Sequence, residues 1–228
     1  MPTEYATLCT ASDRRSKLVG VSINGATESL EIERKYEVSD AAVLPDAASF
    51  ALLGLRLGAP ETHELRASYF DTPNGELASR RLALRNRHGG KDEGWHLKAK
   101  RDDGARELLW PQSTELPDGL RGEVEDRLGS GAIERLGAIA TLRTMRVTLM
   151  LFSEQGNAVI ELADDRVDAT NELTGGRQVW REWEAELMPG ADESLLDTIE
   201  PLLGAAGATR VRGTSKIQRT MRAGGETQ

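Results

Sequence analysis

The chain has 228 residues, of which 39% are hydrophobic, 29% are charged and only 4% are aromatic. That length is sufficient for a hydrophobic core of its own, and the composition is typical of a globular protein. The formal net charge is −8, which argues against a non-specific nucleic-acid binder, because such proteins carry a basic face.

The chain contains a single cysteine, Cys9, so it cannot form a disulfide or a cysteine-based zinc site within itself. No apolar run approaches the roughly 20 residues that a membrane helix requires. The first residues, MPTEYATLCTASDRRSKL, lack the apolar centre of a secretory signal. These observations predict a cytoplasmic protein that does not associate with membranes.

The first part of the chain is predicted to contain a leader, a strand and a helix. Residues 1–29 are rich in Ser, Thr, Gly and Ala and show no sustained period, which predicts a poorly ordered leader. Apolar and charged residues then alternate from Leu30 to Val38, which is typical of a strand. A helical pattern follows at about 46–57, with Asp46 as a start signal.

The rest of the chain is dominated by short segments that alternate or are rich in β-forming residues, with turn residues between them. These predicted strands lie at 62–71, 81–88, 94–101, 105–110, 140–152, 157–168 and 177–188. Helical patterns interrupt the strands at about 117–137 and 191–206. Many short strands with few helices predict an α+β fold, in which an antiparallel barrel or sandwich is decorated with helices.

Charged residues gather on one face of several predicted strands, because successive side chains point to opposite faces. The basic faces comprise Arg81, Arg85 and Arg87 in one strand and His96, Lys98 and Lys100 in the next. The acidic faces comprise Glu161 and Asp165 in one strand and Glu182, Glu184 and Glu186 in another. The first strand combines both signs on one face, in Glu31, Glu33 and Lys35.

A charged face is ordinarily the solvated side of an antiparallel sheet. Solvated faces mix Ser, Thr, Gln and Lys, however, whereas these faces carry almost only Arg, Lys, Glu or Asp. Four of the five faces carry charges of a single sign. In a closed barrel the faces could point inward, where clustered cations or clustered carboxylates would repel one another without a counter-charge. A linear polyphosphate bound beside a divalent metal ion satisfies both sets, and hard oxygen ligands select Mg²⁺ or Mn²⁺.

The segment Glu31-Ile32-Glu33-Arg34-Lys35 resembles the ExExK signature of the CYTH superfamily, also called the triphosphate tunnel metalloenzymes. Later segments resemble further family motifs in the expected order. They are YFDTP at 69–73, LRxR within 82–87, W-x-L-K-x-K at 95–100, Glu161 with Asp165, Glu184-x-Glu186, and Ser215-Lys216. The resemblance covers residues 30 to about 222, which is nearly all of the chain outside the leader.

The resemblance implies a closed eight-stranded antiparallel β-barrel, the triphosphate tunnel, over residues 30–222, followed by a tail at 223–228. It implies hydrolysis of a terminal phosphoanhydride, with Glu31, Glu33 and Lys35 at the catalytic centre. The implied phosphate-binding residues are Lys35, Arg85, Arg87, Lys98, Lys100, Arg106, Arg146 and Lys216. The implied ligands of Mg²⁺ or Mn²⁺ are Glu31, Glu33, Glu161, Asp165, Glu184 and Glu186.

One position departs from the family pattern. The family often carries Arg-x-Glu on the strand after the lysine pair, whereas Arg106 and Glu107 are adjacent in this chain. Only one of two neighbouring strand residues can face the interior. We expect Arg106 to be that residue.

The favoured substrate is inorganic tripolyphosphate. Alternatives within the family are a nucleoside triphosphatase, a thiamine triphosphatase or a class IV-type adenylate cyclase, and outside enzymology a polyphosphate-binding module without turnover. The chain most resembles the CYTH module that precedes a CHAD domain, a histidine-rich helical module linked to polyphosphate. With three histidines in the chain, a CHAD domain is expected only in a longer parent protein. A monomer or a homodimer is expected, without a nucleic-acid partner.

Overall fold

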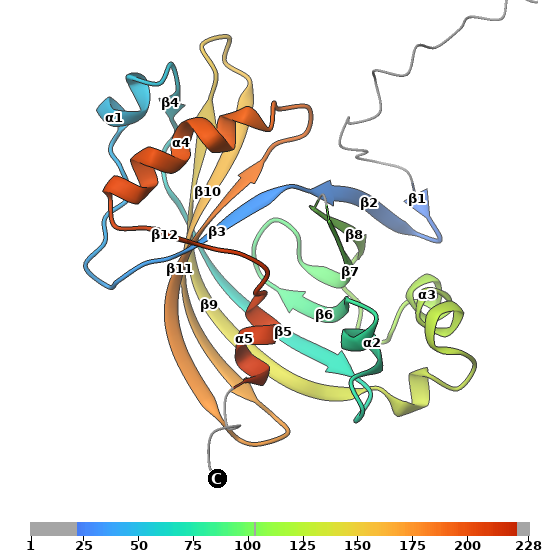
Figure 1. Cartoon of the computed structure of the whole chain (residues 1–228). Helices are drawn as coiled ribbons and strands as arrows, with labels where there is room; N and C mark the ends of the chain where they lie inside the picture. Colours follow the sequence, from blue (N-terminus) through green and yellow to red (C-terminus); the bar gives the residue numbers. More distant parts are fainter. Residues whose placement is uncertain (1–21, 103, 223–228) are drawn as a thin grey trace, which may run out of the picture.

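The computed structural model describes residues 22–102 and 104–222, in which one large curled sheet is covered by short helices (Figure 1). The strands are β1 (Ser22–Ile23), β2 (Ala26–Glu31), β3 (Glu33–Glu37), β4 (Arg56–Leu57), β5 (Glu61–Asp71), β6 (Leu82–His88), β7 (Gly94–Arg101), β8 (Gly104–Trp110), β9 (Gly137–Phe152), β10 (Ala158–Asn171), β11 (Arg177–Leu187) and β12 (Thr209–Val211). The helices are α1 (Ala47–Ala51), α2 (Glu76–Ser79), α3 (Asp118–Leu128), the 3₁₀ turn η1 (Ile133–Arg135), α4 (Ser194–Ala205) and α5 (Lys216–Met221).

The sheet is antiparallel and open. Its hydrogen-bonded order is β1-β2-β8-β7-β6-β5-β9-β10-β11-β3-β12, and β4 pairs with β9 outside this path. The predicted closed barrel of eight strands is therefore wrong, because eleven strands of the described chain form a path with two free ends. The three additional strands of the path are the short strands β1 and β12 and the one gained where the first predicted strand divides into β2 and β3.

Residue Ile32 explains how an open sheet still brings its distant strands together. It alone separates β2 from β3, yet β2 pairs with β8 near one end of the path and β3 pairs with β11 near the other. Consecutive Cα atoms are only about 3.8 Å apart, so the chain itself joins these two parts of the sheet. The sheet must curl, and residues on its inner face then lie opposite one another.

The predicted strands from 62–71 to 177–188 agree with β5 to β11 to within three residues at each end. The helices are shorter than their patterns. Asp46 accepts a hydrogen bond from Ser49 N at 2.9 Å and starts α1 as predicted, but the helix ends at Ala51. The pattern at 117–137 divides into α3 and η1, and β9 has begun by Gly137.

The ordered domain begins earlier than predicted. Strand β1 and the first residues of β2 fall within the expected leader, and Ala26 is buried in the core. The remaining part of the predicted leader, at 1–21, and the predicted tail, at 223–228, lie outside the described residues.

Three hydrophobic clusters attach the helices to the sheet. The first packs α4, through Ile199 and Leu203, on Trp183. A second packs α3 on the tryptophans of β7 and β8. The third lies on the inner face, where Ile217 and Met221 of α5 pack beside a buried group that includes Tyr69, Ile139 and Trp180. This third cluster holds α5 against the inner face of the curled sheet (Figure 1).

Candidate active site

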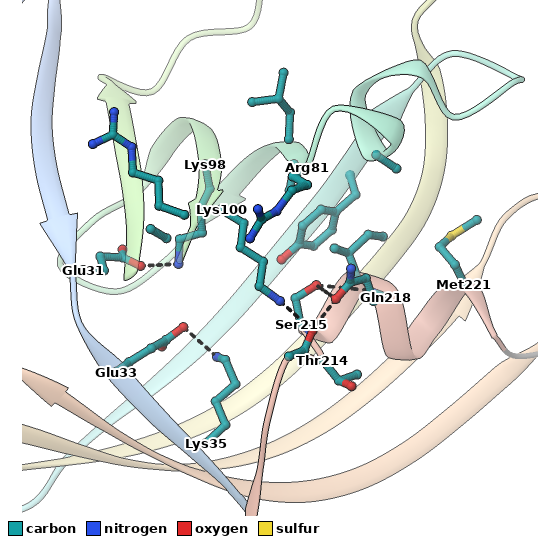
Figure 2. A pocket seen from close by; sticks show the side chains of 18 of the residues that line it. Glu31, Glu33, Lys35, Arg81, Lys98, Lys100, Thr214, Ser215, Gln218 and Met221 are labelled. Carbon is teal, nitrogen blue, oxygen red and sulfur yellow. Dashed lines mark hydrogen bonds and ion pairs between the residues drawn. The ribbon is translucent and has the colours of Figure 1, made fainter. Parts of the chain in front are cut away.

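Two adjoining cavities lie inside the curled sheet, an outer one of about 670 Å³ and an inner one of about 150 Å³. Figure 2 shows side chains that line the outer cavity. The residues common to both cavities are Glu31, Glu33, Lys35, Tyr69, Ala83, Lys98, Ser215 and Ile217. These common residues form the boundary at which the two cavities meet.

Most of the residues predicted for the site line these cavities. Glu31, Glu33, Lys35 and Lys98 line both, and Lys100 lines the outer cavity. The inner cavity adds Arg85, Arg87, Arg146, Glu161, Glu184, Glu186 and Lys216. Asp165 lies just behind the wall, with no exposed surface, and contacts two lining residues, Arg146 and Lys216.

Arg106 is the exception, and its predicted position was wrong. Its Nη2 atom lies 3.1 Å from Oε2 of Glu28, and neither cavity includes the arginine. Glu107 lines the inner cavity instead, because β8 pairs with β7 in a register that sets Glu107 opposite Lys98 and Arg106 opposite Ala99. The family spacing could not decide between two adjacent residues, and the register of β8 on β7 decides it.

Glu31 and Lys98 form the ion pair that joins β2 to β7 at the boundary of the cavities (Figure 2). Burial raises the pKa of the Glu31 carboxyl well above its usual range, and the nearby carboxylates of Glu107 and Glu186 add to this against the opposing charge of Lys98. Burial disfavours the ammonium of Lys98, but the surrounding carboxylates, Glu31 first, outweigh it and raise the lysine pKa. The boundary between the cavities therefore contains the ammonium of Lys98 together with several carboxylates.

A second network lies deeper, where β9, β10, β11 and α5 meet. Arg146 donates from Nε and Nη2 to Asp165 at 2.7 and 2.6 Å, and Nη2 also donates to Oε2 of Glu184 at 2.7 Å. Lys35 contacts Glu184 as well. Burial opposes ionisation of Glu184, but Lys216, Lys35 and Arg146 outweigh burial and hold its pKa well below the usual range.

Helix α5 brings Lys216 into this network. The side chain of Ser215 accepts a hydrogen bond from Gln218 N at 3.3 Å, and Gln218 Oε1 in turn accepts one from Ser215 N at 3.0 Å. This capping box makes Lys216 the first residue of the helix. Its Nζ atom lies 2.6 Å from Oε1 of Glu182, a residue that the family motifs did not single out.

Carboxylates form two groups on the inner face of β3, β10 and β11. Glu161, Glu186 and Glu33 occupy one row, each directly opposite the next across adjacent strands. Such partners have Cβ atoms about 4.5–5.5 Å apart, and like charges there destabilise a sheet. Asp165, Glu182 and Glu184 form the other group, in which one oxygen from each lies within 4.8 Å of the others.

The inner cavity ends at two arginines of β6. Arg85 lies 3.4 Å from both Tyr69 Oη and Glu107 Oε1. Burial opposes ionisation of the Tyr69 hydroxyl, but Arg85 outweighs it and lowers the tyrosine pKa. Arg87 donates to the backbone oxygen of Asp92 at 2.9 Å. In the described part of the chain, the Nε atoms of both arginines are buried without a hydrogen-bond partner.

Sequence reasoning missed Glu107 and Tyr69 as cavity residues, and Glu182 as a member of the deeper network around Lys216. A signal for Glu182 was present, because it shares strand parity with Glu184 and Glu186. Tyr69 opens the YFDTP segment, in which Asp71 shapes a turn by accepting hydrogen bonds from Leu77 N and Ala78 N at 2.8 and 3.0 Å. Tyr69 precedes that turn on β5 and points inward.

The lining of the outer cavity is both apolar and basic. Ile139, Ile217 and Met221 form an apolar part next to α5. The lining cations are Arg34, Lys35, Arg81, Lys98, Lys100, Arg101, Arg210, Arg212 and Arg222. Lys100 donates to the backbone oxygen of Gly213 at 2.7 Å, which connects β7 with the loop before α5 (Figure 2). None of the described helices is long and apolar enough to cross a membrane.

Comparison with solved structures identifies related folds. The proposed adenylate cyclase from Bacillus halodurans is 24% identical and aligns with a TM-score of 0.50, covering 84% of this chain and 97% of that chain. The proposed adenylyl cyclase HpAC1 from Hippeastrum, for which a dominant triphosphatase activity is described, is 21% identical with a TM-score of 0.52, covering 84% and 95%. At this level of identity the likeness shows a common fold.

Comparison with protein sequences identifies the family. Two Mycobacterium tuberculosis proteins, MT2285 of strain CDC 1551 / Oshkosh and Rv2226 of strain ATCC 25618 / H37Rv, are each 32% identical over 206 residues. The match covers 84% of this chain and 40% of each relative, so the chain spans less than half of their length. The model of the CYTH domain matches residues 29–221. The chain therefore belongs to the CYTH domain family.

Proposed function

We propose that this CYTH domain hydrolyses the terminal phosphoanhydride of a linear triphosphate with the help of Mg²⁺ or Mn²⁺, and that inorganic tripolyphosphate is its substrate. The observation that carries the proposal is the meeting of cations and carboxylates from separate strands in one pair of cavities. Neither the cations nor the carboxylates would be stable in a confined space without charges of the opposite sign. A polyanion bound beside a divalent cation balances both.

The cations fit a chain of phosphate groups. Arg85, Arg87, Arg146 and Lys216 line the inner cavity, Lys35 and Lys98 lie at the boundary, and Lys100 lies beyond it. The unpartnered Nε atoms of Arg85 and Arg87 retain capacity to donate. Arginine suits bidentate contacts with phosphate, whereas lysine supplies a point charge. We assign the terminal phosphoryl group to the inner cavity and the remainder to the boundary and beyond.

We assign the divalent metal ion to the carboxylate row of Glu33, Glu161 and Glu186, because like charges directly opposite one another on adjacent strands are stabilised by a cation bound between them. Glu31 and Glu184 line the same cavity and could contribute further oxygen ligands, Glu184 after release from its contacts with Lys35, Arg146 and Lys216. Asp165 fits less well than predicted, since Arg146 and Lys216 already occupy its oxygens. A bound ion would polarise a phosphoryl oxygen and lower the pKa of a bound water.

The residues of the chain would then act by binding and orientation. Phosphoryl transfer depends mainly on positioning and on stabilising charge. Lys35 already joins Glu33 and Glu184, at 3.2 Å from Glu33, so it is held where phosphate and metal ligands meet. We infer catalytic roles for Glu31, Glu33 and Lys35 and phosphate-binding roles for the inner arginines. Arg106 lies outside this arrangement.

A second candidate substrate is an organic triphosphate, such as a nucleoside triphosphate. The apolar side of the outer cavity favours it, because Ile139, Ile217 and Met221 could cover a non-polar leaving end. The activity described for the Hippeastrum protein and the cyclase name of the Bacillus halodurans protein are compatible with this class. Since the curated relatives are longer than the chain, we also propose that the domain works beside a second domain, such as a CHAD domain, in a longer protein.

The deciding experiment measures phosphate release from tripolyphosphate, ATP and thiamine triphosphate, each with Mg²⁺, Mn²⁺ or excess chelator. We expect metal-dependent release that is fastest from tripolyphosphate. Faster release from ATP would favour the organic triphosphate, and pyrophosphate with cyclic AMP would identify a cyclase. Tight binding of tripolyphosphate without release under any metal condition would replace the proposed enzyme by a polyphosphate-binding module.

A further inference from the structure

His96, on β7, has no exposed surface, and its ring lies between two oxygen acceptors. Its Nε2 atom is 2.9 Å from the backbone oxygen of Asp92, in the loop between β6 and β7, and Nδ1 is 3.0 Å from Oε1 of Glu107 on β8. A carbonyl oxygen only accepts, so Nε2 carries a hydrogen. The Nδ1 atom also lies 3.5 Å from Nη2 of Arg85, and burial together with the charge of Arg85 lowers the pKa of His96 to about 4.

Each acceptor also holds one of the two inner arginines. Glu107 Oε1, which contacts His96, lies 3.4 Å from Nη2 of Arg85. The backbone oxygen of Asp92 accepts from Nη2 of Arg87 at 2.9 Å, and the carboxylate of Asp92 lies 3.2 Å from the same nitrogen. Two branches therefore leave the imidazole, one through Glu107 to Arg85 and one through Asp92 to Arg87.

These branches have a consequence for phosphate binding. Arg85 and Arg87 alternate along β6 on the face that lines the inner cavity, and the Nε atom of each has no partner among the described residues. A planar guanidinium binds phosphate in a bidentate manner only when its plane is held in the right orientation. Two of the contacts that set those planes, with Glu107 Oε1 and with the backbone oxygen of Asp92, involve acceptors that the ring of His96 shares.

We propose that His96 is a positioning residue, which orients Arg85 through Glu107 and Arg87 through Asp92. The proposal rests on the proposed function, because it concerns the arginines assigned to phosphate binding. It differs from a purely structural role in one respect. A histidine that only fills the core would affect stability, whereas a positioning residue affects the affinity of the arginines for phosphate.

Two conservative variants separate the branches. The amide group of asparagine is attached at the same distance along the side chain as Nδ1, and that of glutamine at the same distance as Nε2. His96→Asn therefore retains a polar group toward Glu107 and loses the contact with Asp92. His96→Gln retains a donor toward Asp92 and loses the contact with Glu107. His96→Leu loses both.

The readouts are KM and kcat for tripolyphosphate with metal, and the dissociation constant of tripolyphosphate in chelator by calorimetry. We expect His96→Leu to raise KM and the dissociation constant roughly 10- to 100-fold, the range found when an orienting partner is removed. The kcat value should change much less, because the lost contacts would stabilise the bound substrate and the transition state equally. The asparagine and glutamine variants should each show an intermediate loss.

Double-mutant cycles between His96 and each arginine test the two branches directly. In an Arg87→Ala background, His96→Asn should have almost no further effect on the dissociation constant, whereas His96→Gln should keep its full effect. In an Arg85→Ala background the order should reverse. Equal effects of both His96 variants in both backgrounds would contradict the proposal.

Leu97→Ala is the matched control for loss of stability. Leu97 is the next residue of β7, is 2% exposed and packs on the opposite face in a hydrophobic cluster. It should lower the melting temperature without changing KM. If the His96 variants behave like Leu97→Ala, with a lower melting temperature and unchanged tripolyphosphate affinity, the inference is wrong while the proposed function stands. If the wild type neither binds nor hydrolyses tripolyphosphate, both are wrong.

Discussion

The Nζ atom of Lys216 lies 2.6 Å from Oε1 of Glu184, so that an ion pair inside the cavity joins helix α5 to strand β11. The same nitrogen lies 2.6 Å from Glu182 and 2.9 Å from Asp165. Three carboxylates that could otherwise hold a metal ion thus surround the ammonium of a lysine. The charge balance of this part of the site depends on the position of the last described helix.

Removing this ammonium should destabilise the protein and expose a cation site. In Lys216→Met three buried carboxylates lose a partner, which we expect to cost about 3–5 kcal/mol in metal-free buffer. Mn²⁺ should then raise the melting temperature of the variant more than that of the wild type, because the ion takes the place of the ammonium. Lys100→Met is the control, since Lys100 is exposed and contacts a backbone oxygen. An unchanged melting temperature in Lys216→Met would contradict the importance of this contact.

Neutralising a carboxylate at the cavity boundary should separate turnover from binding. We expect Glu33→Gln to lower kcat by roughly 10²–10³-fold, the loss typical when one electrostatic partner of a transition state is removed. Tripolyphosphate affinity without metal should be retained, because the phosphate-binding cations remain. Phosphate release and calorimetry check the two parts. Glu28→Gln is the control, since Glu28 pairs with Arg106 outside the cavities, and it should leave kcat unchanged.

The positions of Arg87 and Arg106 predict opposite outcomes for the same substitution. Arg87→Ala should raise KM for tripolyphosphate at least about tenfold, since a charge-assisted contact with phosphate contributes about 1.5–3 kcal/mol. Arg106→Ala should leave KM unchanged and lower stability by no more than about 1 kcal/mol, as expected for a partly exposed pair. A larger KM effect from Arg106→Ala would restore that residue to the phosphate-binding set.

Stability in metal-free buffer should fall in acid because of Glu184. Burial disfavours its ionisation, but Lys216, Lys35 and Arg146 hold its folded-state pKa well below the usual value, whereas an unfolded glutamate titrates near about 4.3. Between these two pKa values the unfolded state binds more protons. The contribution of Glu184 is therefore complete above about pH 5 and is lost as pH falls toward its folded pKa.

Thermal unfolding of the wild type and of Glu184→Gln from pH 7 to pH 3 measures this contribution. The variant should melt at a lower temperature at pH 7, and the difference between the two proteins should shrink as the pH falls below 5. Glu154→Gln, a change on the exposed turn between β9 and β10, should follow the wild type at every pH. A difference that stays constant with pH would show that Glu184 does not titrate differently in the folded protein.

Much of the site could be predicted from local patterns. Strand parity alone grouped Arg85 with Arg87 and Glu184 with Glu186, and each pair does line the inner cavity. Parity depends only on the alternation of side chains along one extended segment, which is a property of the local sequence. The family motifs extended this grouping from single strands to the whole chain, and the CYTH match confirmed the family.

The contacts between strands could be identified only from the tertiary structure. Whether Arg106 or Glu107 faces inward follows from the register of β8 on β7, and the row of Glu33, Glu186 and Glu161 follows from two further registers. The interruption at Ile32, which gives a curled but open sheet, also arises from a change of pairing partner. The sequence by itself determined which side chains share a face. Pairing decided which faces meet, because hydrogen bonds between strands join residues far apart in the chain, and no local period encodes them.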